Sequence, residues 1–160
     1  MIIIVMGVTG SGKTTVGRRL AERFALAFHE GDDFHPPENK EKMSAGSPLT
    51  DQDRLPWLEQ LRAVLQYAAA RNAGAVLACS ALKKSYRKIL SAGAARFVYL
   101  KASPELVRDR LRRRTGHFMP PSLVDSQFAD LEEPDDALVV DAALEPDTIV
   151  GRIAQALGLA

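Results

Sequence analysis

The chain has 160 residues, enough for one domain with a substantial core and too few for two ordinary domains. Its formal net charge is +1 at pH 7, so the composition gives no reason to expect nucleic acid or an anionic membrane as a partner. The one cysteine, Cys79, excludes an internal disulfide, and no apolar run reaches the roughly 20 residues of a membrane span. Met1 leads directly into an apolar run, so we expect a cytoplasmic protein without a targeting peptide.

The first half of the chain begins with a continuous apolar run, Ile2 to Met6, which predicts a buried strand. A glycine-rich turn follows, and Lys13 to Phe24 then carries apolar residues at helical spacing. A weaker apolar run, Leu26 to His29, predicts the second strand. The segment Asp32 to Thr50 is charged and rich in proline, and we predict an irregular functional insertion there, because long insertions in compact α/β domains usually serve function. Gln52 to Arg71 repeats leucine at helical steps.

The second half continues the alternation of strands and helices. The predicted strands span Ala75 to Cys79, Phe97 to Leu100 and Leu138 to Val140, and the predicted helices span Pro104 to Arg113 and Asp147 to Leu157. A stretch with glycine and proline, Thr115 to Pro121, predicts a lid. Continuous apolar strands that alternate with helices are typical of an α/β fold with a parallel sheet, so we expect a single domain over residues 1–160.

The turn after the first predicted strand matches the phosphate-loop pattern G-x-x-x-x-G-K-[ST] in full. Glycines let successive backbone N–H groups point at phosphate oxygens, and the following helix adds the positive end of its dipole. A turn that binds nothing is the alternative, but the strand–loop–helix context favours ATP. We expect the Lys13 ammonium on the β- and γ-phosphates and the Thr14 hydroxyl on Mg²⁺. The expected nucleotide-binding residues are Gly7, Val8, Thr9, Gly10, Ser11, Gly12, Lys13, Thr14 and Thr15.

Other features favour a kinase over other phosphate-loop proteins. A GTPase needs a guanine-reading N-K-x-D motif, but the single Asn-Lys pair, Asn39-Lys40, is followed by Glu41-Lys42. The chain is also too short to include the elements of an oligomeric motor. These observations predict a small kinase.

Further motifs resemble those of bacterial-type gluconokinases. They are Gly31-Asp32-Asp33-Phe34-His35-Pro36, Asn39, Asp53-Arg54, Pro56-Trp57-Leu58, Cys79-Ser80-Ala81-Leu82-Lys83-Lys84, Tyr86-Arg87, Arg114-x-Gly116-His117-Phe118, Gln127-Phe128 and Leu131-Glu132-x-Pro134. The resemblance extends from Met6 to about Val140. It implies a P-loop kinase fold related to shikimate and adenylate kinases, with a five-stranded parallel sheet flanked by helices and a homodimeric assembly. It also implies an acceptor-binding insertion over about residues 32–72, a lid over about residues 114–123, Mg-ATP as donor and D-gluconate as acceptor.

Asp32 follows the second predicted strand, at the edge of the sheet where ligands bind in open α/β folds. Kinase chemistry needs a carboxylate there, either to orient or deprotonate the attacking hydroxyl or to hold Mg²⁺ through water. Both roles stay open at this point, and a helix cap is the structural alternative. His35 is a candidate hydrogen-bonding partner for an acceptor hydroxyl. The guanidinium of Arg54 suits a substrate carboxylate, with a surface ion pair to Asp51 or Asp53 as the alternative.

Basic residues follow the third and fourth predicted strands. Ser80, Lys83, Lys84 and Arg87 are candidate contacts for the acceptor, although one or two of the three cations are expected to be solvated. We expect Arg110 near the adenine and Arg114 on the phosphates, at spacing i, i+4 on one helix face. A lid arginine stabilises the charge that spreads over the transferring group, so we count Lys13, Asp32 and Arg114 as catalytic. His117 is a further expected lid contact.

With the resemblance, these candidates predict the transfer of a phosphoryl group from ATP to the terminal hydroxyl of D-gluconate. A kinase for another small hydroxy acid, such as shikimate, is one alternative. A non-catalytic ATP-binding regulatory domain is the other, and it predicts nucleotide binding without release of ADP that depends on an acceptor.

Overall fold

The five predicted apolar runs form one parallel sheet with the strand order β2-β3-β1-β4-β5. The computed structural model describes residues 1–91, 94–114 and 120–159. The strands are β1 Ile2–Met6, β2 Ala27–Glu30, β3 Ala75–Ala78, β4 Arg96–Lys101 and β5 Leu138–Asp141. The helices are α1 Lys13–Arg23, α2 Pro37–Ser44, α3 Asp51–Ala70, α4 Lys84–Leu90, α5 Pro104–Arg113, α6 Pro121–Asp130 and α7 Pro146–Leu157, with a 3₁₀ turn, η1, at Gly31–Phe34. No helix within these described ranges combines the length and apolar character that crossing a bilayer requires.

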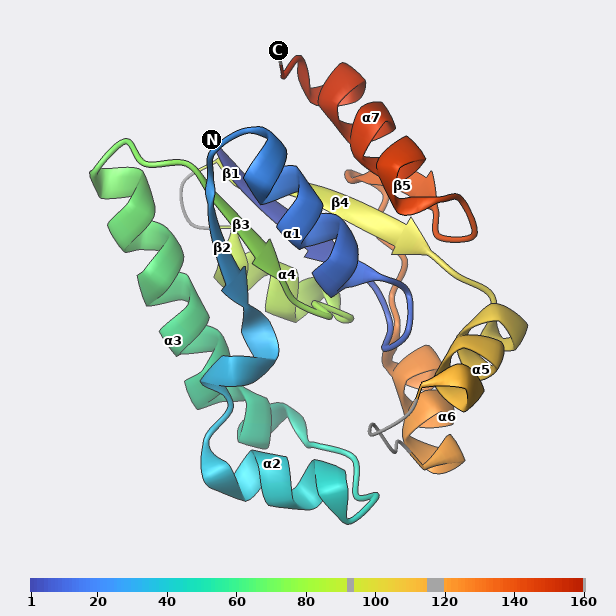
Figure 1. Cartoon of the computed structure of the whole chain (residues 1–160). Helices are drawn as coiled ribbons and strands as arrows, with labels where there is room; N and C mark the ends of the chain where they lie inside the picture. Colours follow the sequence, from blue (N-terminus) through green and yellow to red (C-terminus); the bar gives the residue numbers. More distant parts are fainter. Residues whose placement is uncertain (92–93, 115–119, 160) are drawn as a thin grey trace.

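Helices cover both faces of the sheet, as Figure 1 shows. On one face, Ile3 and Val5 of the central strand β1 pack in a core with residues of α1 and α7. On the other face, Ile4 and Met6 pack in a second core with residues of α3 and α4. Burial of both faces explains why the strand is apolar at every position and does not alternate. The sequence-based expectation of a parallel α/β sheet is therefore confirmed.

Three short helices were not expected. Helix α2 lies inside the predicted irregular insertion, α4 follows β3, and α6 follows the predicted lid. Pro37 and Pro121 stand at the first position of α2 and α6, where a missing N–H costs nothing and the fixed φ angle favours a helix. Prolines that suggest irregular chain in the sequence therefore begin helices in the fold. The predicted lid falls partly outside the described residues.

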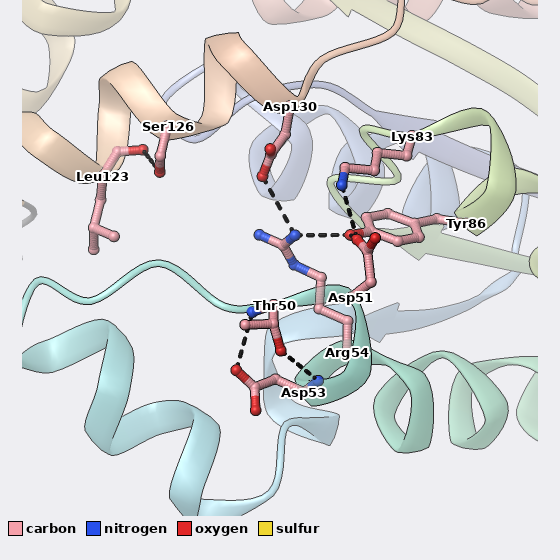
Figure 2. Close-up of polar contacts among 9 residues, drawn as sticks. All are labelled: Thr50, Asp51, Asp53, Arg54, Lys83, Tyr86, Leu123, Ser126 and Asp130. Atoms are coloured by element: carbon pink, nitrogen blue, oxygen red, sulfur yellow. Dashed lines mark hydrogen bonds and ion pairs between the residues drawn. The ribbon is translucent and has the colours of Figure 1, made fainter.

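The N-terminus of α3 is fixed by a capping box. The Thr50 side chain accepts a hydrogen bond from the backbone of Asp53 at 3.0 Å, and the Asp53 carboxylate accepts one from the backbone of Thr50 at 3.0 Å. Figure 2 shows these two reciprocal bonds. The cap satisfies N–H groups that a helix end leaves without partners, and it sets where Arg54 and Trp57 project from the helix.

Candidate active site

The phosphate loop connects β1 to α1 at the carboxyl edge of the sheet (Figure 1). Gly7 has a φ angle of 148°, and a Cβ atom there would meet Ser11 Oγ at 2.8 Å and Leu100 O at 2.9 Å. Gly12 has a φ angle of 100° at the start of α1. Both positions need glycine, because side chains rarely tolerate these angles. The loop is further held by a hydrogen bond of 3.2 Å from Gly7 N to Ser80 O.

The interior of the loop fits a phosphate group. Ser11 Oγ is the one fully buried side-chain polar atom without a hydrogen-bond partner in the described part of the chain. The Lys13 ammonium donates to Val8 O at 3.0 Å, inside the curve of the loop. Burial lowers the pKa of Lys13, while the charges of Asp32 and Glu30 act in the opposite direction. A cation hydrogen-bonded to a backbone carbonyl, in a loop that also holds an unsatisfied hydroxyl, is suited to exchange that carbonyl for phosphate oxygens.

A cavity of about 90 Å³ lies beside this loop and joins it to the insertion. Its walls come from the phosphate loop, the end of β2, α2, α3, the segment after β3, and α6. The lining residues are Thr9, Lys13, Asp32, His35, Met43, Pro48, Leu49, Arg54, Trp57, Ser80, Leu82, Leu123, Ser126 and Gln127. The structure therefore brings together six of the sequence-predicted site residues: Thr9, Lys13, Asp32, His35, Arg54 and Ser80.

Glu30 is a functional candidate that the sequence reasoning missed. It ends β2, and its carboxylate accepts a hydrogen bond from the hydroxyl of Thr14. Burial raises the pKa of Glu30, while the bond from Thr14 acts against this rise. The signal in the sequence was a second carboxylate two residues before Asp32, at the same strand end. Carboxylate and hydroxyl oxygens side by side are ligands that suit Mg²⁺.

Arg54 lies in a polar network that connects three helices (Figure 2). One terminal nitrogen, Nη1, donates to the hydroxyl of Tyr86 at 2.8 Å and to the carboxylate of Asp130 at 3.3 Å. Tyr86 in turn donates to Asp51. In Figure 2 the other terminal nitrogen of Arg54 points away from both partners. The ion pair of Arg54 is thus to Asp130, and not to Asp51 or Asp53, which were the structural alternative to a substrate carboxylate. The other terminal nitrogen makes neither of these contacts.

The three basic residues after β3, Lys83, Lys84 and Arg87, make separate contacts. Lys83 forms an ion pair of 2.8 Å with Asp51, and Lys84 is exposed with its backbone N–H bonded to Glu132 Oε1 at 3.0 Å. Arg87 is only 8% exposed and donates to the backbone carbonyls of Ala81, Leu82 and Glu132 at 2.8 to 3.0 Å. None of these three side chains lines the cavity. For Arg87 the prediction of an acceptor contact therefore needs correction, because its guanidinium satisfies buried carbonyls instead.

The arginines of α5 approach the phosphate loop from its outer side. Arg110 donates to Gly10 O at 3.2 Å and Ser11 O at 3.1 Å, and also to Ala142 O. Its guanidinium thus supports the loop and β5 together. Arg114 caps the end of α5, and its charge contributes to lowering the pKa of Lys13. Thr15 is exposed at the first turn of α1. His117 lies outside the described residues.

Gln127 is a second residue whose role the sequence reasoning did not assign. Its Oε1 accepts a hydrogen bond of 2.6 Å from the backbone N–H of Thr9, across 118 residues of sequence. Gln127 thereby connects α6 to the phosphate loop at the edge of the cavity. A contact between two segments so distant in sequence has no local pattern that could have revealed it.

Several known proteins that resemble this chain over most of its length are kinases. The family model described as shikimate kinase matches residues 9–154. A gluconokinase from Gluconobacter oxydans is 48% identical over 156 residues, covering 94% of this chain and 88% of that protein. The solved structure of a sugar kinase from Janibacter sp. has a TM-score of 0.93 at 41% identity and covers 99% of this chain and 95% of that one. A gluconokinase from Sinorhizobium meliloti has a TM-score of 0.82 at 43% identity, with coverages of 98% and 94%.

Proposed function

Since this chain belongs to the gluconokinase family, within the shikimate kinase-like P-loop kinases, we propose that it transfers the γ-phosphoryl group of ATP to the 6-hydroxyl of D-gluconate. The observation that carries this proposal is the cavity in which the phosphate-loop lysine, a carboxylate and an arginine meet. A phosphoryl acceptor with a hydroxyl at one end and a carboxylate at the other complements these three charges. The relatives named gluconokinase support the choice of acceptor.

In this proposal, Asp32 accepts the proton of the attacking hydroxyl as its oxygen forms the new bond to phosphorus. The bond from phosphorus to the β-phosphate oxygen breaks at the same time, and ADP leaves. Lys13 neutralises charge on the transferring group, and we propose the same role for Arg114, which caps the end of α5. Arg54 holds the carboxylate of the acceptor with the part of its fork that Tyr86 and Asp130 leave free.

Thr14 and Glu30 are the residues we propose to hold Mg²⁺, the first directly and the second through water. Their side chains already touch, so a cation at the Thr14 hydroxyl is also within reach of the Glu30 carboxylate. When bound, Mg²⁺ neutralises charge on the phosphates. This division leaves Asp32 to the acceptor, and we therefore propose the base role for Asp32 over a metal role.

The assignment of Asp32 can be tested with a matched neighbour. We expect Asp32→Asn to lower kcat by roughly 10²- to 10⁴-fold, the usual contribution of a general base, with the dissociation constant for ATP unchanged. Asp33→Asn removes the adjacent exposed carboxylate, which does not line the cavity, and should keep kcat. Coupled ADP release measures the rate, and calorimetry measures ATP binding. Full turnover in Asp32→Asn would show that Asp32 is not the general base.

The acceptor itself is tested by comparing D-gluconate with shikimate, glucose and no acceptor in the same assay. We expect ADP release only with gluconate. Turnover with another acceptor would leave the assignment of the phosphate loop to ATP unchanged. It would require a different acceptor in the cavity. ATP binding without any acceptor-dependent turnover would favour a regulatory domain.

We also propose that the enzyme is a cytoplasmic homodimer. Its support is an apolar groove of about 670 Å³ between α3 and the edge strand β2, where Tyr67 is 66% exposed. Exposed apolar grooves next to a strand edge are surfaces that a second subunit covers. A lone buried cysteine is in keeping with a reducing compartment.

A further inference from the structure

Asn39 of α2 is almost fully buried, yet the proposed reaction does not use it. Its side chain is 3% exposed, and its Nδ2 donates to the backbone carbonyl of Asp53 at 2.9 Å. Because a carbonyl can only accept, this bond fixes which end of the amide is the nitrogen. The same nitrogen has a second N–H, and it lies 3.2 Å from Nδ1 of His35. Asn39 therefore donates to the histidine.

This contact determines where His35 carries its proton. A ring nitrogen that accepts a hydrogen bond has no proton of its own, so the neutral ring is protonated on Nε2. Burial lowers the pKa of His35 to about 4; Asp32 acts to raise it, whereas Arg54 and Lys40 lower it further. The ring is therefore neutral near pH 7.

The orientation of the ring is fixed as well. Trp57 stacks on His35 with a centroid distance of 4.1 Å and an interplanar angle of 15°. The Trp57 indole is itself held, because its N–H donates to Gly31 O at 2.7 Å. Gly31 directly precedes Asp32, so the histidine and the proposed base are held by one continuous set of contacts. Rotation of the imidazole would break the stack and the bond from Asn39.

The remaining ring nitrogen, Nε2, is available to a ligand. His35 lines the cavity together with Asp32 and Arg54. Within residues 1–91, 94–114 and 120–159, no hydrogen bond occupies Nε2, and it is not among the fully buried atoms without a partner. Its N–H therefore opens toward the cavity. A hydroxyl oxygen of a ligand can accept from it.

We propose that Asn39 is a positioning residue that holds His35 as the Nε2–H tautomer, so that the cavity presents a neutral donor in a fixed direction to a chain hydroxyl of the acceptor. This inference rests on the proposed function and deepens it. The cavity then offers a carboxylate at Asp32, a neutral donor at His35 and a cation at Arg54. That set complements a polyhydroxy acid, which has a reacting hydroxyl, further hydroxyls and a carboxylate.

The tautomer can be measured in the wild-type protein without substrate. The chain has three histidines, so the long-range ¹H–¹⁵N spectrum of protein labelled at histidine is simple, and His35→Gln identifies the signals of His35. We expect an unprotonated Nδ1 and a protonated Nε2 at neutral pH. A protonated Nδ1 would overturn the proposal. This reading does not depend on which acceptor the enzyme uses.

Kinetics test the consequence for the acceptor. Asn39→Leu keeps the approximate volume and removes the donor, and we expect the KM for gluconate to rise about tenfold, the effect of one hydrogen bond, with the KM for ATP unchanged. Glu41→Gln, on the exposed side of the same helix, is the control and should leave both constants unchanged. An unchanged KM for gluconate in folded Asn39→Leu would contradict the proposal.

Two substitutions of His35 distinguish the contributions of its two ring nitrogens. Glutamine places an N–H near the position of Nε2, whereas asparagine reaches only the position of Nδ1. We expect His35→Gln to keep a KM for gluconate about tenfold lower than that of His35→Asn. Equal losses in the two variants would overturn the role of Nε2. If the wild type does not turn over gluconate, the proposed function fails while the spectroscopic result stands.

Discussion

Arg54 and Arg87 differ in how well they can bind an acceptor, because their guanidinium groups contact different partners. Arg54 contacts a hydroxyl and a carboxylate at the wall of the cavity. Arg87 contacts the backbone carbonyls of Ala81 and Leu82, before α4, and of Glu132, after α6. The first arrangement leaves donors for a ligand, and the second uses them to join the segment after β3 to the segment after α6. Only the first is suited to recognition of an acceptor.

We expect Arg87→Met to destabilise the fold without weakening binding of the acceptor. Methionine keeps the length of the side chain but removes the donor to three backbone carbonyls, of which Leu82 O still accepts from Glu132 N at 2.8 Å. We expect a cost of about 2–4 kcal/mol in the free energy of unfolding. Urea unfolding measures this loss, and Lys88→Met at the neighbouring exposed position is the control. A raised KM for gluconate with normal stability would restore Arg87 to the acceptor site.

Residue type and strand ends were enough to predict part of the site. Lys13 follows from the phosphate-loop motif, and Asp32 follows from its place after β2, because ligands gather where parallel strands end. The direction of each cation after β3 could not be predicted, since it depends on which carbonyls and carboxylates approach from α3 and α6. Glu30 was missed because its role depends on contact with Thr14 of α1, which only the folded arrangement of β2 and α1 creates.

Among the elements, the capping box of α3 has the clearest measurable effect. We expect Thr50→Ala to lower the free energy of unfolding by about 1 kcal/mol, the usual value of a helix cap, and Tm by about 2–4 °C. Because the cap sets the start of the helix that contains Arg54, the KM for gluconate should rise in the same variant. A thermal melt and the coupled assay check these two effects.

The same cap predicts how stability depends on pH. The backbone N–H of Thr50, with help from Lys42, lowers the pKa of Asp53 from 3.8 to about 2. A lowered pKa in the folded state means that the ionised carboxylate stabilises the fold above pH 3.8, and that this contribution is lost as the pH falls toward 2. The urea midpoint of the wild type should therefore exceed that of Asp53→Asn by the largest amount at about pH 6. The difference should become small as the pH falls toward 2. A gap independent of pH would contradict this account.

Helix α6 contacts the phosphate loop through Gln127. In Gln127→Glu, the carboxylate still accepts from Thr9 N, but it adds negative charge beside the phosphate loop. We expect the KM for ATP to rise about tenfold or more, since like charges repel strongly where little water screens them. Ala129→Glu adds the same charge at an exposed position of the same helix and serves as the control. Equal effects of the two substitutions would argue against a special position for Gln127.

The long helices were predictable, and the short ones were not. Helices α1, α3, α5 and α7 were expected close to their observed bounds, because their helical pattern extends over ten or more residues, while the five strands were expected from continuous apolar runs, of which that of β2 is the weakest. Helix α4 has seven residues, and half of the eight residues of α2 are charged, with one buried residue, Asn39. Tertiary contacts and caps, not periodicity, stabilise helices of this kind.

At the scale of the whole molecule, the apolar groove between α3 and β2 predicts an assembly. We expect light scattering to give twice the chain mass of 17.4 kDa, and Tyr67→Glu to give the single chain mass, because a buried charge opposes association. Gln66→Glu adds the same charge on the same helix but outside the groove, and it should leave the dimer intact. A wild-type monomer at high concentration would contradict the assembly.

The supports of the phosphate loop come from late in the chain. The loop is complete by Thr14, but Thr9 is held by Gln127, and Gly10 and Ser11 are joined through Arg110 to Ala142. During synthesis, a nascent chain therefore displays the entire nucleotide motif long before the residues that brace it have left the ribosome. Affinity for ATP should appear only after the chain through Ala142 has emerged, so the nucleotide can stabilise the folded protein but cannot guide the early steps of its folding.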